Sequence, residues 1–530
     1  MTISLTERQK SWSTLIALWL VLLLLAALRP LAVPDEGRYG EISRWMLQSG
    51  DWLTPRLNGI PFFHKPPLLH WLEAISLAAF GINEVALRLV PALHGGLMLV
   101  TLYLAGRAIG GEALARRALL MLGSSLGFLI GGQYVNHDML VASWIALAIW
   151  CFGFAFMAGD KPSAWWARLG FVACALGMLS KGLIGVALPG MVILLWLIWT
   201  RQLKKIIHLP WLTGLALFAA IALPWFAMAW QKYPQVLDYM FVNQQFTRYT
   251  ASTYNNPQPW WFYLASLLLL LFPWVFFVFG PGRRHGSALP ASAAAPVARE
   301  WLALCWIWVV SIVVFFSIPH SKLIGYVLPV LPALTLLAAV GWQRNMAQRP
   351  LARKLFAALG LLNAGIALAI VTQVAGVTRE GRAQDLAAVL ACAAQPSDTV
   401  YVTGAYPYDL PFYAQLPKPM VVLDNWPLLR REAGDGWQRE LFEGADFDPQ
   451  TAALLQPMQA LPSAGLTPGN WLVLRIGDEA VLNKTGWQRF YEGAGWRLYR
   501  SAGGSAAEGP EPAQQIGLPG CKDQRHKQGQ

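Results

Sequence analysis

Apolar residues form long uninterrupted blocks along the chain, and this pattern predicts a protein with many membrane-spanning helices. A block of about 20 apolar residues is long enough to cross a bilayer as a helix. Such blocks recur as far as residue 375, and short polar loops separate most of them. We predict a polytopic α-helical membrane protein of about 11–13 transmembrane helices. The eleven blocks that we interpret as spans are 12–31, 86–109, 113–132, 137–158, 164–180, 182–199, 208–230, 261–280, 300–317, 322–341 and 352–375.

The loop at residues 32–85 is too long to be a simple connection between the first two spans. It contains two helix-like pieces, at 36–48 and 67–80, each with mixed apolar and polar faces. Helices of this kind lie in the membrane interface. We predict that this first outer loop belongs to a transmembrane domain covering residues 1–375.

The rest of the chain predicts a small α/β domain, at 376–501, followed by a tail. In this domain a helix-like piece, Gly381 to Ala394, precedes four strand-like runs. Alternation of strands with helical or loop segments favours an α/β fold. Residues 502–530 are rich in Gly, Ala, Pro and Gln, and this composition predicts disorder. The strand-like runs are 399–403, 420–423, 471–476 and 496–499.

The composition excludes a soluble globular protein. Only 13% of the residues are charged, about half of the roughly 25% that is typical of soluble domains. The strands of an outer-membrane barrel would alternate in short segments, which is not the pattern of this chain. The five cysteines contain no Cys-x-x-Cys pair, so they indicate neither a zinc site nor a redox motif.

The net charge of +12 comes from basic loops rather than from a nucleic-acid-binding surface. By the positive-inside rule, these loops and the N-terminus lie in the cytoplasm. An odd number of spans then places the C-terminal domain on the outer side. The first block is long for a signal peptide and lacks a cleavage site, which favours an uncleaved helix. The basic loop residues are Arg107, Arg116, Arg117, Lys161, Arg168, Arg201, Lys204, Lys205, Arg283, Arg284, Arg344, Arg349, Arg353 and Lys354.

Charged residues follow the first span directly, in the run Asp35-Glu36-Gly37-Arg38-Tyr39. The structural interpretation is a helix start, with Asp35 as the N-cap and an acidic first turn. That interpretation explains Asp35 and Glu36 better than it explains Arg38 and Tyr39. These residues are therefore also candidates for chemistry at the membrane surface.

A second candidate segment is the stiff, proline-rich run around His64-Lys65-Pro66-Pro67. Lys65 can extend to lipid headgroups, or it can bind a phosphate. His64 is a weak candidate for a metal ligand, because a single histidine is more often an ordinary polar contact.

Further ionisable residues occur near the outer ends of later spans. Asp138 lies where the fourth predicted span begins, and Lys181 lies between two apolar blocks, at a depth where charges are costly and often functional. Lys322 and Tyr326 are near the outer side, and Arg248 is in the outer loop 231–260.

These candidates gather at the outer interface, which favours an enzyme acting on lipid-borne phosphates. Cations can hold a phosphate leaving group, and a carboxylate can orient or deprotonate an acceptor. A lipid or sugar transporter would instead place its charges near the midplane, often in paired repeats. A membrane scaffold would leave the first-loop motif unexplained.

The motif order resembles that of the bacterial lipid A aminoarabinose transferases, within the protein O-mannosyltransferase-like glycosyltransferases. The resemblance covers most of residues 12–340. It rests on Asp35-Glu36-Gly37-Arg38-Tyr39, Gly50-Asp51-Trp52-Leu53-Thr54-Pro55, Lys65-Pro66-Pro67-Leu68, Ser180-Lys181-Gly182 and Ser321-Lys322-Leu323-Ile324-Gly325-Tyr326-Val327-Leu328-Pro329.

The resemblance implies a GT-C fold in a bacterial inner membrane, with the active site and C-terminal domain in the periplasm. It implies an undecaprenyl-phosphate-linked sugar as donor and lipid A as acceptor. Asp35 matches the family's essential acid and Asp138 its second acid. Arg38, Tyr39 and Lys65 match residues near the donor phosphate, and we expect Arg248, Lys322 and Tyr326 to assist in substrate binding.

The chain departs from the family at two positions associated with a bound metal. His64 stands where the family usually has Glu, and Gln244-Gln245 stands where a Glu-His pair is frequent. A divalent metal is therefore possible but not required, and the sugar is either 4-amino-4-deoxy-L-arabinose or a hexosamine. The alternative acceptor is a protein or another envelope glycan.

Overall fold

The computed structural model describes residues 5–247, 256–279, 296–346, 349–377, 381–432, 434, 436–482 and 486–502. Apart from Ala502, the predicted tail lies outside these residues. The chain forms two compact units: residues 1–29 with 63–373, and residues 30–62 with 374–530. Residues 30–62, which belong to the predicted transmembrane domain, cluster with the C-terminal residues.

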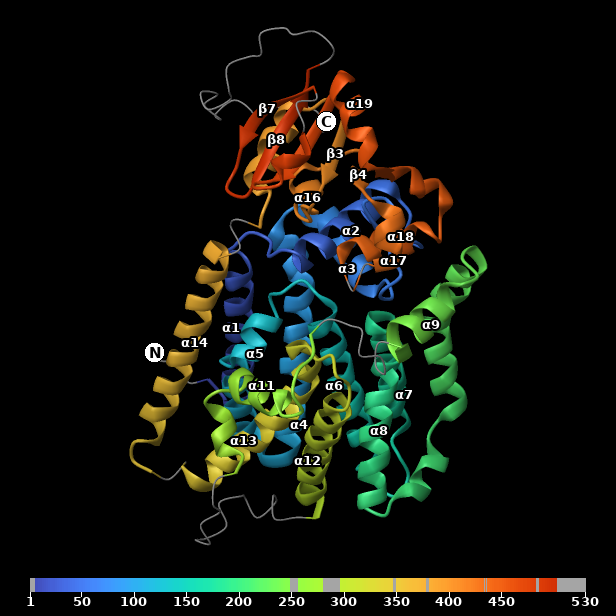
Figure 1. Cartoon of the computed structure of the whole chain (residues 1–530). Coiled ribbons are helices and arrows are strands. Elements are labelled where there is room, and N and C mark those ends of the chain that lie inside the picture. The colour runs from blue at the N-terminus through green and yellow to red at the C-terminus, as the bar shows by residue number, and fades with distance from the viewer. Residues whose placement is uncertain are drawn as a thin grey trace. The chain divides into compact units, whose positions relative to one another are not determined.

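The first unit is a bundle of apolar helices in which every predicted span has a helical counterpart (Figure 1). Within the described residues, seven helices are long and apolar enough to cross a membrane. The elements are α1 (Glu7–Ala26), α3 (Leu68–Phe80), α4 (Glu84–Gly123), α5 (Leu126–Gly131), α6 (His137–Phe156), α7 (Ala164–Lys181), α8 (Ile184–Trp199), η1 (Leu203–His208), α9 (Trp211–Lys232), η2 (Asp238–Thr247), α11 (Phe262–Leu270), η3 (Trp274–Phe277), α12 (Pro296–Ser317), η5 (Ile324–Val330), α13 (Leu331–Asn345) and α14 (Ala352–Val377).

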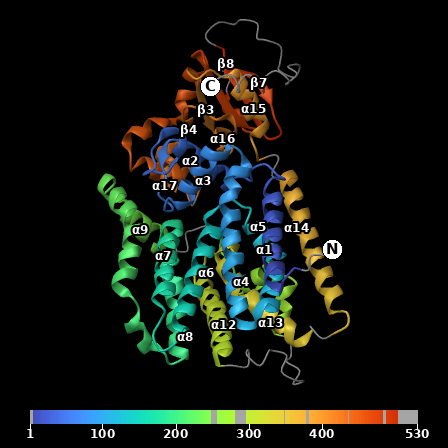
Figure 2. The same ribbon diagram turned by 180° about the vertical axis from the view of Figure 1, so that it is seen from behind.

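Close packing of small residues holds α7 against α8. Helix α6 lies against α7, and α7 lies against α8 and α9 (Figure 2). Where α7 meets α8, a Cβ on Gly185 would come within 2.2 Å of the carbonyl carbon of Gly177. Without side chains at this crossing, the two backbones approach closely. The loop between α7 and α8, which begins at Gly182, is thereby fixed.

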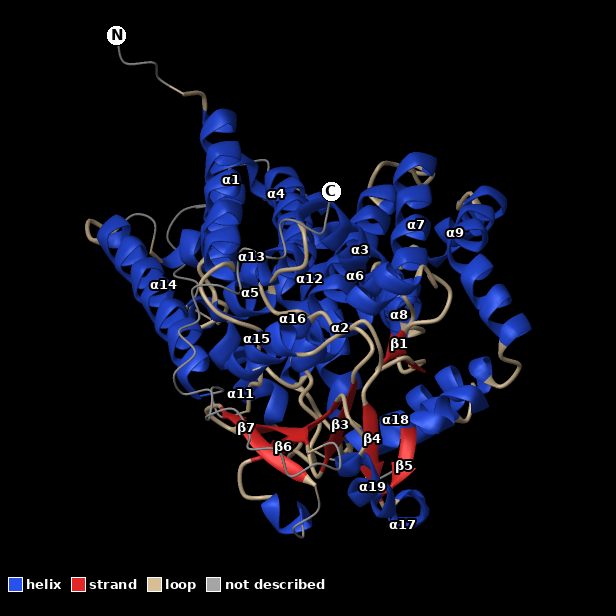
Figure 3. Ribbon diagram, turned by 90° about the horizontal axis from the view of Figure 1, so that it is seen from above, coloured by secondary structure: helices blue, strands red, loops and turns tan. Residues whose placement is uncertain are grey.

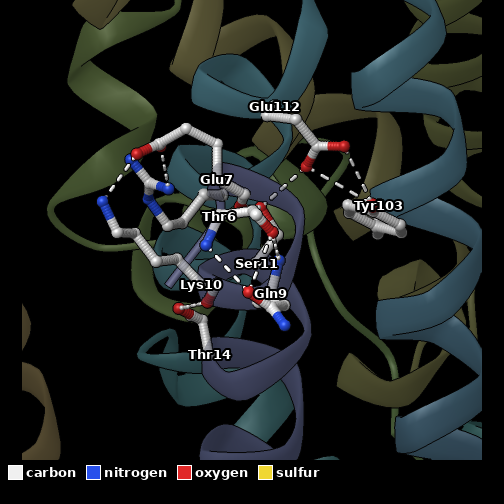
Figure 4. A network of polar contacts seen from close by, with 9 residues as sticks. Thr6, Glu7, Gln9, Lys10, Ser11, Thr14, Tyr103 and Glu112 are labelled. Carbon is white, nitrogen blue, oxygen red and sulfur yellow. Dashed lines mark hydrogen bonds and ion pairs between the residues drawn. The ribbon is translucent and has the colours of Figure 1, made fainter. Parts of the chain in front are cut away.

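Helix α4 is broken at Gly110–Gly111, which joins two of the predicted spans. Gly111 has a φ of 74°, a conformation that glycine adopts readily. Beyond the break, Glu112 accepts hydrogen bonds from Ser11 at 2.8 Å and from Tyr103 at 3.1 Å (Figure 4). Arg116 pairs with Glu7 at 2.7 Å, so the polar residues near this end of α1 attach it to the part of α4 that follows the break.

The second unit contains a six-stranded mixed sheet (Figure 3). Its strand order is β5-β4-β3-β6-β8-β7; the first four strands are parallel, and β8 is antiparallel to both β6 and β7. The predicted strand-like runs correspond to β3 (Thr399–Thr403), β4 (Val421–Asp424), β6 (Asn470–Arg475) and β8 (Trp496–Ser501). The elements not predicted are β5 (Leu455–Pro457), β7 (Trp487–Glu492), α16 (Leu410–Ala414), α17 (Trp426–Glu432), α18 (Trp437–Ala445), η6 (Pro449–Leu454), η7 (Met458–Ala460), α19 (Leu461–Leu466) and η8 (Glu479–Leu482).

The first half of the outer loop is built into this second unit. Helix α2 (Asp35–Ser49) is followed by a short hairpin of β1 (Arg56–Leu57) and β2 (Ile60–Pro61). Asn58 and Gly59 form its turn with positive φ angles, as Asn-Gly pairs do in tight hairpins. The buried amide of Asn58 donates to the carbonyl of Met420 and accepts from its N–H, both at 2.8 Å. This reciprocal pair joins the hairpin to the start of β4.

Helix α2 also contacts the segment that follows β3. A Cβ on Gly37 would lie 2.9 Å from backbone atoms of both Tyr408 and Asp409, so only glycine permits this approach. The buried carboxylate of Asp409 accepts from the N–H of Ala383, just before α15 (Gln384–Ala393). The helix predicted at 381–394 is thereby connected to the same segment.

The buried Asp409 predicts a specific dependence of stability on pH. Burial raises the pKa of its carboxyl from 3.8 to about 6, although the Ala383 N–H favours the anion. The native state therefore binds the proton more tightly than the unfolded chain, and stability falls as pH rises from about 4 to about 6, by up to about 3 kcal/mol. Asp409→Asn should flatten this dependence, measured as thermal unfolding of the detergent-solubilised protein between pH 4 and 7.

Asp446→Asn is the matched control, because the Asp446 side chain is 56% exposed and pairs with Arg430 at the surface. An unchanged pH profile in Asp409→Asn would contradict the assignment.

Candidate functional site

In the first unit, Asp138 is paired with Lys181. Asp138 is in the first turn of α6, where the N-cap Asn136 accepts from its N–H at 2.9 Å and donates to its Oδ2 at 3.1 Å. The Oδ1 of Asp138 accepts from the ammonium of Lys181 in a short ion pair. The two side chains are only 14% and 10% exposed. Lys181 is the last residue of α7 and is followed by Gly182, which has a φ of 82°.

Tyr326, from η5, completes this group. The ammonium of Lys181 lies 4.5 Å from the centre of its ring, within the range of a cation–π interaction. The neighbouring Gly325 permits the arrangement, because a Cβ there would lie 2.0 Å from Oδ2 of Asp138. The predicted residues Asp138 and Tyr326 are thus brought together by Lys181.

Lys65 and His64 lie in the same unit, just before α3. Lys65 is half-buried and is close enough to His137 for the two to interact electrostatically. His137 itself contacts the carbonyl of Ser180 at 2.9 Å. His64 is also half-buried, with its ring 5.9 Å from that of Tyr239.

Within the described part of the chain, no group of three or more His, Cys, Asp or Glu side chains could hold a metal ion. A metal site at His64 stays a prediction, and no step proposed below passes through a metal.

Lys322 is the remaining predicted residue of this unit that the structure describes. Lys322 is 4% exposed, and its ammonium donates to the carbonyls of Gln258 at 2.9 Å and Pro319 at 2.6 Å. These contacts join two loop segments. Its proposed role in substrate binding is untested, as is that of Arg248, which lies outside the described residues.

In the second unit, α2 carries Asp35, Arg38 and Tyr39. The expected N-cap role of Asp35 is wrong, because Pro34 is the N-cap and no side chain caps this end. The buried Glu36 instead accepts from the N–H of Ala32 at 2.7 Å. Asp35 is 39% exposed along its side chain and lies 3.9 Å from the guanidinium of Arg38.

Arg38 makes its closest contacts with the C-terminal residues of its own unit. Its Nη1 lies 3.0 Å from Oε1 of Glu440 on α18, and its Nη2 donates to the hydroxyl of Tyr408 at 3.4 Å. Its guanidinium carbon is 4.9 Å from the Tyr408 ring and 6.0 Å from the Tyr39 ring. Burial would lower the pKa of Arg38, but Glu440 and the neighbouring groups more than offset this and raise it. The cation is therefore permanent.

Each unit thus places a carboxylate beside a cation, an arrangement that can orient a polar acceptor and stabilise a phosphate. Lys181 carries a signal in the sequence, as a charge between apolar blocks, but its pairing with Asp138 is visible only in the fold. Glu440 and Tyr408 carried no signal, because they lie in a region without a recognisable motif.

Comparisons with known proteins support the resemblance seen in these motifs. Residues 10–240 match the family model described as dolichyl-phosphate-mannose-protein mannosyltransferase. The chain is 33% identical, over 336 residues, to an undecaprenyl phosphate-α-4-amino-4-deoxy-L-arabinose arabinosyl transferase of Pseudomonas savastanoi pv. phaseolicola. It is 31% identical, over 369 residues, to a protein of the same name from Pseudomonas aeruginosa.

These matches cover 61% and 69% of this chain, and 60% and 65% of the two relatives. The matched part therefore spans somewhat less than two thirds of each relative.

A solved structure extends the likeness to nearly the whole chain. The crystal structure of ArnT from Cupriavidus metallidurans bound to undecaprenyl phosphate superimposes with a TM-score of 0.77 at 24% identity. The alignment covers 94% of this chain and 98% of that one. The predicted GT-C fold class is confirmed, and the chain is a multi-pass membrane protein of that class. Within the class, the predicted resemblance to the aminoarabinose transferases is confirmed.

Because Gly325 lies so close to Asp138, we expect a single added methyl group at this position to lower the stability of the protein. Gly325→Ala would place a carbon against the Asp138 carboxylate and separate it from Lys181. Overpacking of this kind costs on the order of 1–3 kcal/mol, and disturbing a buried ion pair adds to that cost. We expect a lower melting temperature for the purified protein in detergent.

Gly360→Ala, in α14, is the control, because nothing lies within 4 Å of the added carbon. Combining Gly325→Ala with Asp138→Ala should give less than the sum of the two single effects. Strict additivity would show that the methyl group does not act through Asp138.

Proposed function

We propose that this protein is a glycosyltransferase that moves an amino sugar, 4-amino-4-deoxy-L-arabinose, from undecaprenyl phosphate to a phosphate of lipid A. The observation that carries the proposal is the similarity to relatives named for that donor, over the region that contains Asp35, Lys65, Asp138 and Lys181. The similarity to the lipid-bound ArnT structure supports the same class of donor. The acceptor is inferred from the motifs of the first outer loop.

The reaction breaks the bond between the anomeric carbon of the sugar and the phosphate oxygen of the donor. Undecaprenyl phosphate leaves with the electron pair, and the acceptor oxygen forms the new bond to the anomeric carbon. Negative charge grows on the departing phosphate, and nearby cations lower the barrier by stabilising it. We assign this role to Lys65 and Arg38, with Arg248 and Lys322 as further candidates.

The carboxylates have a different task. A phosphate acceptor is already ionised near neutral pH, so it does not need a strong general base. Asp35 would then orient the acceptor or the amino group of the sugar. If the acceptor is a hydroxyl group, Asp35 is instead the base. Asp138 is held by Lys181 and Asn136, and this fixed carboxylate suits the binding of a polar sugar group.

A second candidate function keeps the donor and changes the acceptor to protein hydroxyls or another envelope glycan. The match to a family model named for transfer to protein favours this alternative. The same residues would act, with Asp35 as the base. Finding the sugar on protein rather than on lipid would select it.

We also propose the location and orientation of the protein. The alternation of basic and non-basic loops supports a cytoplasmic N-terminus. In the inner membrane of a bacterium, the motifs of the first outer loop and the C-terminal residues would then face the periplasm, where lipid-linked rather than nucleotide-linked sugars serve as donors.

The proposed reaction predicts that Asp35→Asn abolishes transfer without loss of protein. The variant keeps the size of the side chain and removes the charge. Lipid A from cells with the wild-type gene should carry a mass increment of one aminopentose, which cells without the gene and cells with the variant should lack. Mass spectrometry of lipid A measures all three.

Asp160→Asn is the control, because Asp160 is an exposed acid in the loop between α6 and α7. It should modify lipid A like the wild type. Wild-type modification by Asp35→Asn would falsify the assignment of Asp35. A mass increment of one hexosamine would show that the transferred sugar is a hexosamine, while the proposed transfer reaction would still hold.

A further inference from the structure

In the parallel part of the sheet in the second unit, the strand order reverses between the neighbouring strands β3 and β6. From β3 the chain continues to β4 and β5 on one side, and then returns to β6 on the other. In α/β sheets of this order, ligands bind outside the carboxyl ends of the strands at such a point. In this unit the segment that leaves the carboxyl end of β3 contacts α2, at the close approach between Gly37 and Tyr408–Asp409.

The two partners of Arg38 lie in the segments that follow strands β3 and β4 along the chain. Tyr408 follows the carboxyl end of β3, and Glu440 is on α18, which follows the adjacent strand β4. The side chains of Arg38 and Glu440 are 16% and 13% exposed. Together the Glu440 carboxylate and the Tyr408 hydroxyl engage both terminal nitrogens of the guanidinium, which fixes the plane of this rigid group.

Stability alone is a weak explanation of such a pair. A largely desolvated ion pair gains little over apolar residues of the same shape, because removing both charges from water offsets their attraction. An arginine with five N–H groups also keeps donors beyond the two that Glu440 and Tyr408 engage. Its buried Nε has no hydrogen-bond partner among the described residues.

We propose that Glu440 and Tyr408 are positioning residues that act through Arg38. They hold its guanidinium in the orientation in which the remaining N–H groups meet the phosphate of a lipid-linked donor. The proposal rests on the proposed function for the identity of that ligand, a polyprenyl phosphate monoester or its sugar ester. It assigns to the C-terminal residues a part in the reaction through a first-loop cation.

Enzyme kinetics of the full-length protein test this role. Glu440→Gln keeps the shape and an acceptor oxygen but removes the charge, and Tyr408→Phe keeps the ring but removes the hydroxyl. Each should raise the KM for the lipid-linked donor, with a combined loss of roughly 10- to 100-fold in kcat/KM. Because removing one partner of a largely buried ion pair also lowers stability, kcat/KM is compared at a temperature at which each variant is fully folded.

A double-mutant cycle separates positioning from general folding support. In an Arg38→Lys background, Glu440→Gln should cost less than about twofold, because the residue through which it acts has already changed. Glu443→Gln is the matched control on the same helix, where Glu443 pairs with Arg439 at 2.6 Å. It should leave kcat/KM unchanged. An equal loss from Glu440→Gln in both backgrounds would overturn the proposal.

Binding of undecaprenyl phosphate to the same variants tests the positioning role without turnover. Weaker binding by Glu440→Gln than by Glu443→Gln supports it, and equal binding by both and by the wild type overturns it. The wild-type transfer assay tests the proposed function separately. If the wild type binds the lipid but transfers no amino sugar, the proposed function is contradicted. The comparison of lipid binding between the variants still decides the role of Glu440.

Discussion

The close contact between Gly37 and the backbone of Tyr408–Asp409 is the constraint on which the second unit depends. Any side chain at position 37 would push α2 away from this segment. The separation would also weaken the contacts of Arg38 with Glu440 and Tyr408, and the exchange of hydrogen bonds between Asn58 and Met420 nearby in the same unit. A glycine in the middle of a charged motif thus has a structural reason, while its neighbours Asp35 and Arg38 remain available for chemistry.

The two carboxylate–cation groups differ in how they are built. In the first unit, Asp138 and Lys181 come from helices α6 and α7, and the small residues around them leave just enough space for the pair. In the second unit, Asp35 and Arg38 share one helical turn, and the stronger partner of the cation is Glu440, more than 400 positions away in the sequence. The first group is thus fixed by helix packing, and the second by contacts with a folded α/β unit.

The helical spans, the two helices of the first outer loop and four strands of the sheet could be predicted from the sequence. Their signals are local, because a block of apolar residues or an alternating run marks its own element. The short strand β5 and helices α16 to α19 could not be predicted, since each is shorter than the roughly 11 to 18 residues over which a period can be recognised. The assignment of residues 30–62 to the second unit depends on long-range contacts, such as those of Asn58 and Gly37, that no local pattern encodes.

The candidate site shows the same division. Asp35, Arg38 and Lys65 stand in recognisable motifs and Asp138 stands at the start of an apolar block, so their types and positions are informative. The partners that orient them, Lys181 for Asp138 and Glu440 for Arg38, are defined only by distance in space. Lys322 shows the opposite case, because a residue in a strong motif has its ammonium engaged by backbone carbonyls.

The second unit is formed from two separate parts of the chain, and this has a consequence for biosynthesis. Residues 30–62 leave the ribosome before the 311 residues from 63 to 373, and their partners in the same unit come only afterwards. At about 5–20 residues per second, this interval lasts roughly 15 to 60 seconds. Throughout it, the buried acids and arginines of α2 have no C-terminal residues to pack against. Synthesis of the C-terminal residues, rather than insertion of the early helices, is therefore the event that gives α2 its final surroundings.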